Sequence, residues 1–139
     1  MNLTFIDTSF FLALSLADDA LHQRAVAWQR AIIGKLVTSE FVLLEVADDL
    51  SQPHLRKFAS SIFSFVREDG QISVIPAGHA AFEKGYDLYI ARKDKEWGLT
   101  DCISFQIMRE RGITDALTHD PHFEQAGFRA LLRQDPPSN

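Results

Sequence analysis

The sequence predicts an α/β domain built on a central, mainly parallel sheet of five strands that is flanked by helices. The chain has 139 residues, which is the length of one domain. Apolar runs of four or five residues, typical of buried strands, alternate with longer segments whose apolar residues recur at helical spacing. This alternation is typical of parallel sheets, in which helices connect the strands.

Composition indicates one globular domain over residues 1–134, followed by a short flexible tail over 135–139 with the sequence DPPSN. Apolar residues make up 46% of the chain and charged residues 24%, and the net charge is −5. A generic nucleic-acid binder is usually basic, so the total charge does not predict one. No apolar run approaches the roughly 20 residues that cross a membrane, and no secretory signal begins the chain. With a single cysteine, Cys102, we expect a cytoplasmic protein.

The first half of the chain is expected to contain two strands and four helices. Their order is a strand over 3–6, helices over 9–17 and 20–33, a strand over 35–38, and helices over 39–50 and 53–68. Ser39 is a plausible cap for the helix over 39–50, and Pro53 suits the first position of the helix over 53–68. The last helix carries an apolar stripe, which predicts that one of its faces is buried.

The second half is expected to contain three strands and two helices. Their order is a strand over 72–76, helices over 79–93 and 100–112, and strands over 115–118 and 128–132. Thr100 is the expected cap of the second helix and Gly112 its stop.

Four acidic residues lie at or near the positions where a parallel sheet of this kind binds its ligands. Asp7 follows the first strand, Glu45 is the only charge in the apolar run FVLLEVA, Asp101 begins a helix, and Asp120 follows the fourth strand. Parallel α/β sheets bind ligands at the carboxyl ends of their strands, so we expect these four side chains to converge.

Each acid also has a purely structural interpretation, and the sequence leaves it open. Asp7 could cap the following helix, and Asp101 could complement the helix dipole. Asp120 could open a turn, since Asp-Pro is common there. Glu45 could lie on a wet helix edge or pair with a lysine.

A cluster of four carboxylates would need a cation. Two carboxylates about 4 Å apart repel by roughly 4 kcal/mol at an effective dielectric of 20. Oxygen ligands without a neighbouring cysteine favour Mg²⁺ or Mn²⁺. Such an ion suits phosphate chemistry, because it activates water and neutralises charge on phosphoryl oxygens.

Four stretches, FIDTSFF, TSEFVLLEV, LTDCISFQIMRERGI and ALTHDPHFEQAGF, resemble the PIN-domain proteins, and in particular VapC-type toxins of toxin–antitoxin pairs. The resemblance covers nearly the whole chain. It implies a PIN-like fold and a metal site made by Asp7, Glu45, Asp101 and Asp120. It also implies ribonuclease activity with Mg²⁺ or Mn²⁺, a homodimer, and a small antitoxin that covers or enters the site.

Three hydroxyl residues join this expected site in a supporting role. Thr8 resembles the hydroxyl that often follows the family's first acid and orients that acid or a water. Ser104 and Thr118 are expected as hydrogen-bond donors to the ligands. Local backbone capping is the alternative for the last two.

The substrate contacts are unknown from sequence alone. Five basic residues are suspected of guiding the RNA backbone, with an ordinary solvated surface as the alternative: Arg56, Lys57, Arg92, Lys93 and Lys95. A catalytically silent PIN fold, used only for RNA binding or protein interaction, is the other functional hypothesis. His119 and His122 flank Asp120, but the remaining histidines do not show the spacing of a histidine–aspartate phosphohydrolase.

Overall fold

The computed structural model describes residues 2–138 and confirms the α/β architecture. Within this range one five-stranded sheet has the order β3-β2-β1-β4-β5, and every neighbouring pair is parallel. The strands are β1 (Leu3–Ile6), β2 (Lys35–Ser39), β3 (Ile72–Ile75), β4 (Asp115–Leu117) and β5 (Arg129–Ala130). The sheet is thus parallel throughout, where the sequence predicted a mainly parallel one.

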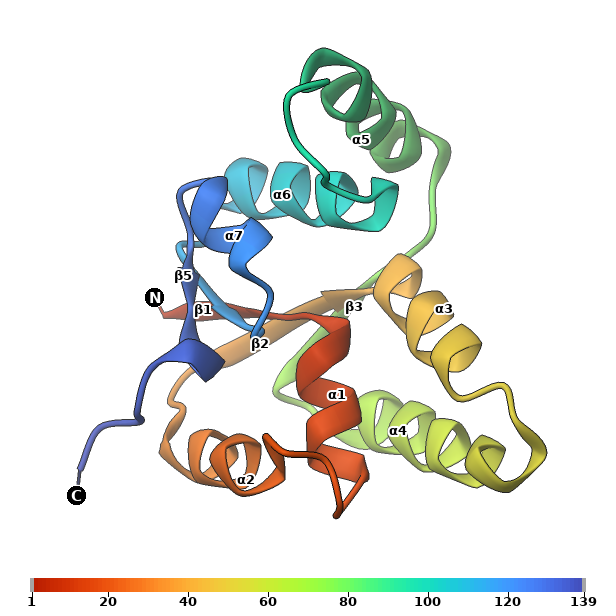
Figure 1. Cartoon of the computed structure of the whole chain (residues 1–139), viewed down its shortest axis with the longest axis vertical. Coiled ribbons are helices and arrows are strands. Elements are labelled where there is room, and N and C mark those ends of the chain that lie inside the picture. Colours follow the sequence, from red (N-terminus) through yellow and green to blue (C-terminus); the bar gives the residue numbers. More distant parts are fainter. Residues whose placement is uncertain (1, 139) are drawn as a thin grey trace.

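Helices cover the sheet on both sides. Between residues 2 and 138 the α-helices are α1 (Thr8–Ser15), α2 (His22–Ala31), α3 (Glu40–Asp49), α4 (Arg56–Glu68), α5 (His79–Ala91), α6 (Leu99–Arg111) and α7 (Pro121–Gln125), with 3₁₀ turns η1 (Pro53–Leu55) and η2 (Leu131–Arg133). Figure 1 shows α1, α2 and α4 below the sheet and α5, α6 and α7 above it, with α3 at the right. No helix among the described residues is long and apolar enough to cross a membrane.

The parallel arrangement brings the ends of β1 and β4 together. Ile6 is paired with Leu117, so the next residues, Asp7 and Thr118, emerge side by side at the carboxyl edge. The backbone N–H of Asp7 donates to the Leu117 carbonyl at 3.2 Å, which continues the ladder by one residue. The expected convergence of strand-end residues therefore follows directly from the register.

An aromatic cluster supports the helices above the sheet. The buried ring of Phe105 on α6 meets Trp97 and Phe123 edge to face, with centroids 5.0 Å and 4.9 Å away. Edge-to-face pairs of this kind add specific geometry to apolar burial. At Gly85 of α5 a Cβ would collide with Ile103 of α6, so the small residue permits these two helices to pack closely.

Three local expectations were wrong. The short helix α7 was not predicted at all, and the last strand is confined to Arg129–Ala130 because the chain then turns into η2. Helix α6 begins at Leu99 with Gly98 as its N-cap, so Thr100 lies inside the helix and is not its cap.

The C-terminal segment leaves the domain beside α2. The indole N–H of Trp28 donates to the Gln134 carbonyl at 2.9 Å, and Arg24 pairs with Asp135, the first residue of the expected tail, at 3.0 Å. Met1, and Asn139 at the end of that tail, lie outside the described residues. The division into a domain and a flexible tail stays a prediction.

Candidate metal centre

Asp7 is a buried acid whose side chain does not cap the helix that follows it. It occupies the N-cap position of α1, yet its side chain accepts no capping hydrogen bond. Instead it accepts from the Thr118 hydroxyl at 2.7 Å, and the residue is only 4% exposed. The pKa of Asp7 is raised from 3.8 to about 7, chiefly by burial, and the charges of Asp101 and Glu45 contribute to the rise. The helix-capping interpretation of Asp7 is therefore wrong.

Glu45 comes from the middle of α3 and turns toward the same region. Its Oε1 accepts a 2.5 Å hydrogen bond from the Thr8 hydroxyl. Burial raises the pKa of Glu45, and the charge of Asp101 raises it further. The Thr8 hydroxyl thus donates to Glu45 and not to Asp7, whereas the sequence expected it to orient Asp7 or a water; the Thr8 backbone amide opposes the rise in the pKa of Asp7.

Asp101 and Asp120 are positioned by the first turns of two helices. Asp101 accepts from the backbone N–H of Gly98 at 3.1 Å at the start of α6. Asp120 is the N-cap of α7 and accepts from the backbone N–H of His122 at 2.9 Å. The structural interpretation of Asp101 fits its place in the first turn of α6, whereas Asp120 begins a helix and not the turn that its structural interpretation expected. Neither position excludes metal binding.

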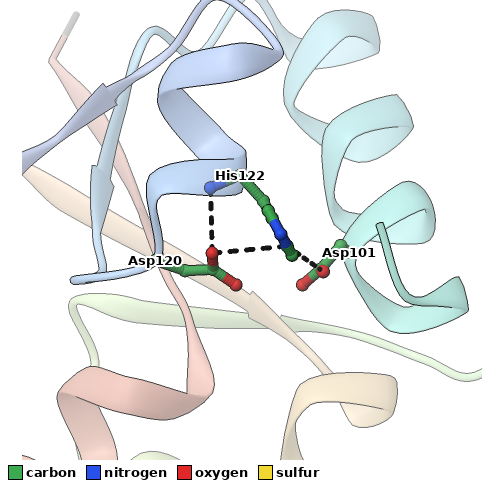
Figure 2. A group of neighbouring side chains, drawn as sticks. All are labelled: Asp101, Asp120 and His122. Carbon is green, nitrogen blue, oxygen red and sulfur yellow. Dashed lines mark hydrogen bonds and ion pairs between the residues drawn. The ribbon is translucent and has the colours of Figure 1, made fainter. Parts of the chain in front are cut away.

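His122 lies between these two acids, as Figure 2 shows. Its Nδ1 is 3.3 Å from Asp101 Oδ2 and 3.4 Å from Asp120 Oδ1. One ligand atom from each of the three residues lies within 4.8 Å of the others. An imidazole nitrogen and two carboxylates at this spacing form a candidate cation site.

Asp101 connects this group to the other two acids. Its pKa is raised by burial and then by the charge of Asp120, while the Gly98 amide and His122 oppose the rise. In turn, its charge raises the pKa of both Asp7 and Glu45. The four acids that the sequence singled out are thus close enough to influence one another, with Asp101 at the centre.

A hydroxyl network joins the two sides of the centre. Thr118 donates its only hydroxyl hydrogen to Asp7, so in the 3.2 Å contact with Ser9 the donor is Ser9. The Thr118 oxygen also accepts from the backbone N–H of Asp120 at 3.1 Å. Ser9 in turn accepts from the backbone N–H of His119 at 3.0 Å. Thr118 is therefore a donor to an acid, as expected, and Ser9 is an added participant that the sequence did not suggest.

Ser104 differs from Thr118. Its hydroxyl is fully buried and finds no hydrogen-bond partner among the described residues. The expected hydrogen bond from Ser104 to a ligand carboxylate is therefore absent from the part of the chain that the structure describes.

The charges of this centre call for a cation. Among residues 2–138 no lysine or arginine pairs with any of the four acids, and the ion pairs of Asp101 and Asp120 are those with His122. The proposed pairing of Glu45 with a lysine is therefore wrong. Carboxylate oxygens are hard ligands that suit both Mg²⁺ and Mn²⁺, and the imidazole nitrogen is also a suitable ligand for Mn²⁺. The residues present fit a divalent cation.

His122 is the residue that sequence reasoning missed. The available signal was the stretch Asp-Pro-His-Phe, because Asp followed by Pro is typical of an N-cap and first helical position. A helix beginning there turns the third residue, His122, back toward its own N-cap, which is what α7 does.

Comparison with known proteins identifies the class. The model of the PIN domain family matches residues 4–129, and the chain belongs to this family. The chain is 29% identical over 124 residues to the 23S rRNA-specific endonuclease VapC20 of Mycobacterium tuberculosis, in two strains, covering 89% of this chain and 94% of that protein. The crystal structure of M. tuberculosis VapC20, described as a sarcin–ricin loop cleaving toxin, matches with a TM-score of 0.85 at 27% identity and covers 94% and 98% of the two chains. The chain is thus a homologue of a VapC ribonuclease toxin.

Proposed function

We propose that this chain is a Mg²⁺- or Mn²⁺-dependent endoribonuclease, and the toxin of a toxin–antitoxin pair. The observation that carries the proposal is the group of Asp101, Asp120 and His122, whose ligand atoms lie within 4.8 Å of one another. Asp7 and Glu45 lie close enough for the charge of Asp101 to raise their pKa values, and no lysine or arginine among the described residues pairs with any of the four acids. Homology to an endonuclease toxin over most of the chain supports it. A small antitoxin and a homodimeric state belong to the same proposal, because both are implied by the VapC resemblance.

Each residue has a role in this proposal. Asp101, Asp120 and His122 would hold the ion, with Asp7 and Glu45 completing the negative site. When bound, the ion would supply Lewis-acid stabilisation of phosphoryl charge and activation of water. Thr118 holds Asp7 and Thr8 holds Glu45 at fixed positions, so that the carboxylates do not swing away when they are ionised.

RNA cleavage by purified protein tests the proposal. The first substrates are a ribosomal RNA fragment with the sarcin–ricin loop, because the homologue is described as cleaving it, and total RNA. We expect cleavage with Mg²⁺ or Mn²⁺, none with EDTA, and at least about a 100-fold loss in Asp7→Asn, as is typical when an electrostatic group of an active site is removed. Asp18→Asn, at an exposed acid in the turn that follows α1, is the matched control and should cleave normally. Wild-type rates in both Asp7→Asn and Asp101→Asn would contradict the proposal.

Metal binding has a readout that does not depend on cleavage. An ion at 100 times its dissociation constant stabilises the folded state by about 2.7 kcal/mol. Thermal unfolding with EDTA and with millimolar Mn²⁺ should therefore differ by several degrees in wild type and much less in Asp101→Asn. Coincident melting curves for the wild type would argue for a silent PIN fold.

A further inference from the structure

A groove with aromatic and basic walls lies between the end of α5 and the start of α6. Its volume is about 690 Å³, and its lining includes Tyr86, Tyr89, Lys93 and Lys95. The two tyrosines are 43% and 44% exposed, and their rings stack with centroids 6.3 Å apart and planes inclined by 21°. Two large rings that lie nearly parallel are thus partly exposed to solvent in this groove.

The floor of the groove is fixed by a chain of contacts. The guanidinium of Arg92 lies over the Trp97 ring, 5.0 Å from its centroid, and forms two hydrogen bonds of 2.9 Å to Asp94. Trp97 is buried, and its indole N–H donates to Gln125 of α7 at 3.0 Å. The connection between α5 and α6 is therefore held in place by these contacts, and Trp97 links it to α7, the helix that carries His122.

The groove has a small excess of basic side chains although the whole chain has a net charge of −5. Its lining holds three cationic side chains and one acid, Glu96, and one of the three cations, Arg92, is paired with Asp94. Neither Lys93 nor Lys95 forms an ion pair with any residue between 2 and 138. Two lysine amines without an acidic partner are available to contact the phosphates of a nucleic acid.

The groove borders the start of α6, the helix that carries Asp101. Gly98 and Leu99 form its last wall, and the backbone N–H of Gly98 donates to Asp101 at the start of α6. Arg56 and Lys57, the other basic residues suspected from the sequence, begin α4, which Figure 1 places at the opposite end of the molecule from α5. The basic residues of the α5–α6 connection are therefore those beside the acids.

We propose that this groove binds unpaired nucleotides of the RNA substrate next to the phosphodiester that is cleaved. Bases stack on Tyr86 and Tyr89, while Lys93 and Lys95 contact the phosphates. Stacking on aromatic side chains and contact with basic groups are the two ways in which proteins hold single-stranded nucleic acid. The inference rests on the proposed ribonuclease function, and it names the part of the substrate that the chain recognises.

A protein partner on this surface is the competing explanation. Tyrosine is common at protein interfaces, but lysine is depleted there. Here Lys93 and Lys95 line the same groove as the tyrosines, and Gly98 at its edge donates its backbone N–H to Asp101 of the candidate metal centre. These two features favour RNA over a second copy of the chain.

Binding of a fluorescent single-stranded RNA of mixed sequence, followed by anisotropy in EDTA so that cleavage does not interfere, tests the aromatic contact. Replacing Tyr86 and Tyr89 together by alanine should weaken binding at least about 25-fold, at roughly fivefold or more for each lost stack. Replacing both by phenylalanine keeps the rings and should leave the affinity within about twofold of wild type. Equal affinity of the alanine variant and wild type would overturn the proposal.

The lysine contacts have a separate readout in the salt dependence. Each lost phosphate contact lowers the slope of log K against log salt by about 0.7 for a single strand, so the Lys93→Ala, Lys95→Ala double variant should lose about 1.4. Lys35→Ala, an exposed lysine at the amino end of β2, is the control and should keep the wild-type slope. An unchanged slope in the double variant would contradict phosphate contact in the groove.

Two further measurements separate the possible failures. If the tyrosine variant changes the oligomeric state by light scattering while RNA binding is unchanged, the surface is an interface between copies and the proposal is wrong. If wild type cleaves RNA and the groove variants keep its KM, the groove inference fails while the proposed function stands. If wild type binds RNA through the groove but does not cleave it with Mg²⁺ or Mn²⁺, the proposed function fails and the groove stands.

Discussion

Two pairs of acids meet at the metal centre and are held in different ways. Asp7 and Glu45, the hydroxyl-bound pair, accept hydrogen bonds from Thr118 and Thr8. Asp101 and Asp120, the backbone-bound pair, accept from backbone N–H groups at the starts of α6 and α7. The side chains of the backbone-bound pair therefore also accept from N–H groups that have no acceptor within a helix. The Asp7 side chain makes no such capping hydrogen bond, and Glu45 lies in the middle of α3.

This difference separates the two contributions that an acidic residue can make. A backbone-bound acid satisfies amide groups at the start of a helix, so its removal affects folding as well as metal binding. For Asp101 this contribution is opposed by burial and by the charge of Asp120, which raise its pKa, so Asp120 is the clearer case. A hydroxyl-bound acid opposes folding in the metal-free protein, because burial and like charge both raise its pKa. Measurements of the free energy of unfolding in EDTA can therefore test the comparison without any assay of cleavage.

The largest expected effect is that of Asp7 on how the stability of the metal-free protein depends on pH. The pKa of Asp7 is about 7 in the folded chain, against the ordinary value of 3.8 that applies to the unfolded chain. Between these two pH values the folded state therefore holds a proton that the unfolded state has released. Stability of the metal-free protein should consequently fall as the pH rises from about 4 to about 7. Asp7→Asn removes this loss and should gain up to about 4 kcal/mol over wild type across that range, at about 1.36 kcal/mol for each pH unit.

Urea unfolding in EDTA at about pH 5 and about pH 8 measures this difference, since the variant should gain most at the higher pH. Asp18→Asn again serves as the control, and its difference from wild type should not change with pH in this way. If Asp7→Asn is less stable than wild type at the higher pH, the acid has a structural role that its contacts do not show.

The next effect concerns Asp120 and belongs to the backbone-bound pair. Asp120→Ala removes the N-cap of α7 and should destabilise the metal-free protein by about 1 kcal/mol, within the usual range of about 0.5–2. Asp120→Asn keeps a capping oxygen and should retain nearly all of the stability. Both variants should bind Mn²⁺ more weakly by calorimetry. A stability of Asp120→Ala equal to that of wild type would remove the distinction between the two pairs.

A smaller effect of opposite sign is expected at Glu45. Glu45→Gln keeps an oxygen that can accept from Thr8 but removes a charge next to Asp101. It should stabilise the metal-free protein at neutral pH by up to about 1 kcal/mol, because solvent screens a partly exposed group. Chemical unfolding in EDTA measures the change, with the exposed Glu68→Gln on α4 as control. A clear loss of stability with cleavage retained would mean that Glu45 is structural.

The comparison also explains what the sequence could predict. The strand ends could be read from short apolar runs, and the carboxyl edge of a parallel sheet brings such ends together, so the convergence of Asp7 with Asp120 followed from the pattern. The partner of Thr8 could not be predicted, because it depends on how α1 packs on α3 and not on neighbours in sequence. The same holds for Ser9, whose contacts lie more than 100 residues away.

The C-terminal region shows the limit of periodicity. Helix α7 has five residues, too few to display a helical repeat, and only the Asp-Pro start could have indicated it. Phe128 to Leu132 is an apolar run that suits a strand or a buried turn equally well. The structure divides it between β5 and η2, because β5 pairs with β4 at only two positions.

The smallest expected effect is at Ser104, which belongs to neither pair. Its hydroxyl is buried on α6, one turn after Asp101, and has no partner among the described residues. A buried hydroxyl without a hydrogen bond opposes folding, and alanine has the higher helix propensity, so Ser104→Ala should stabilise the metal-free protein by about 0.5–1 kcal/mol. Ser64→Ala, on the exposed face of α4, should show the propensity part alone. Mn²⁺ affinity should be unchanged in Ser104→Ala, because the hydroxyl donates to none of the acids. A fall in Mn²⁺ affinity would instead give Ser104 the supporting role that the sequence predicted for it, and would extend the hydroxyl-bound side of the centre to α6.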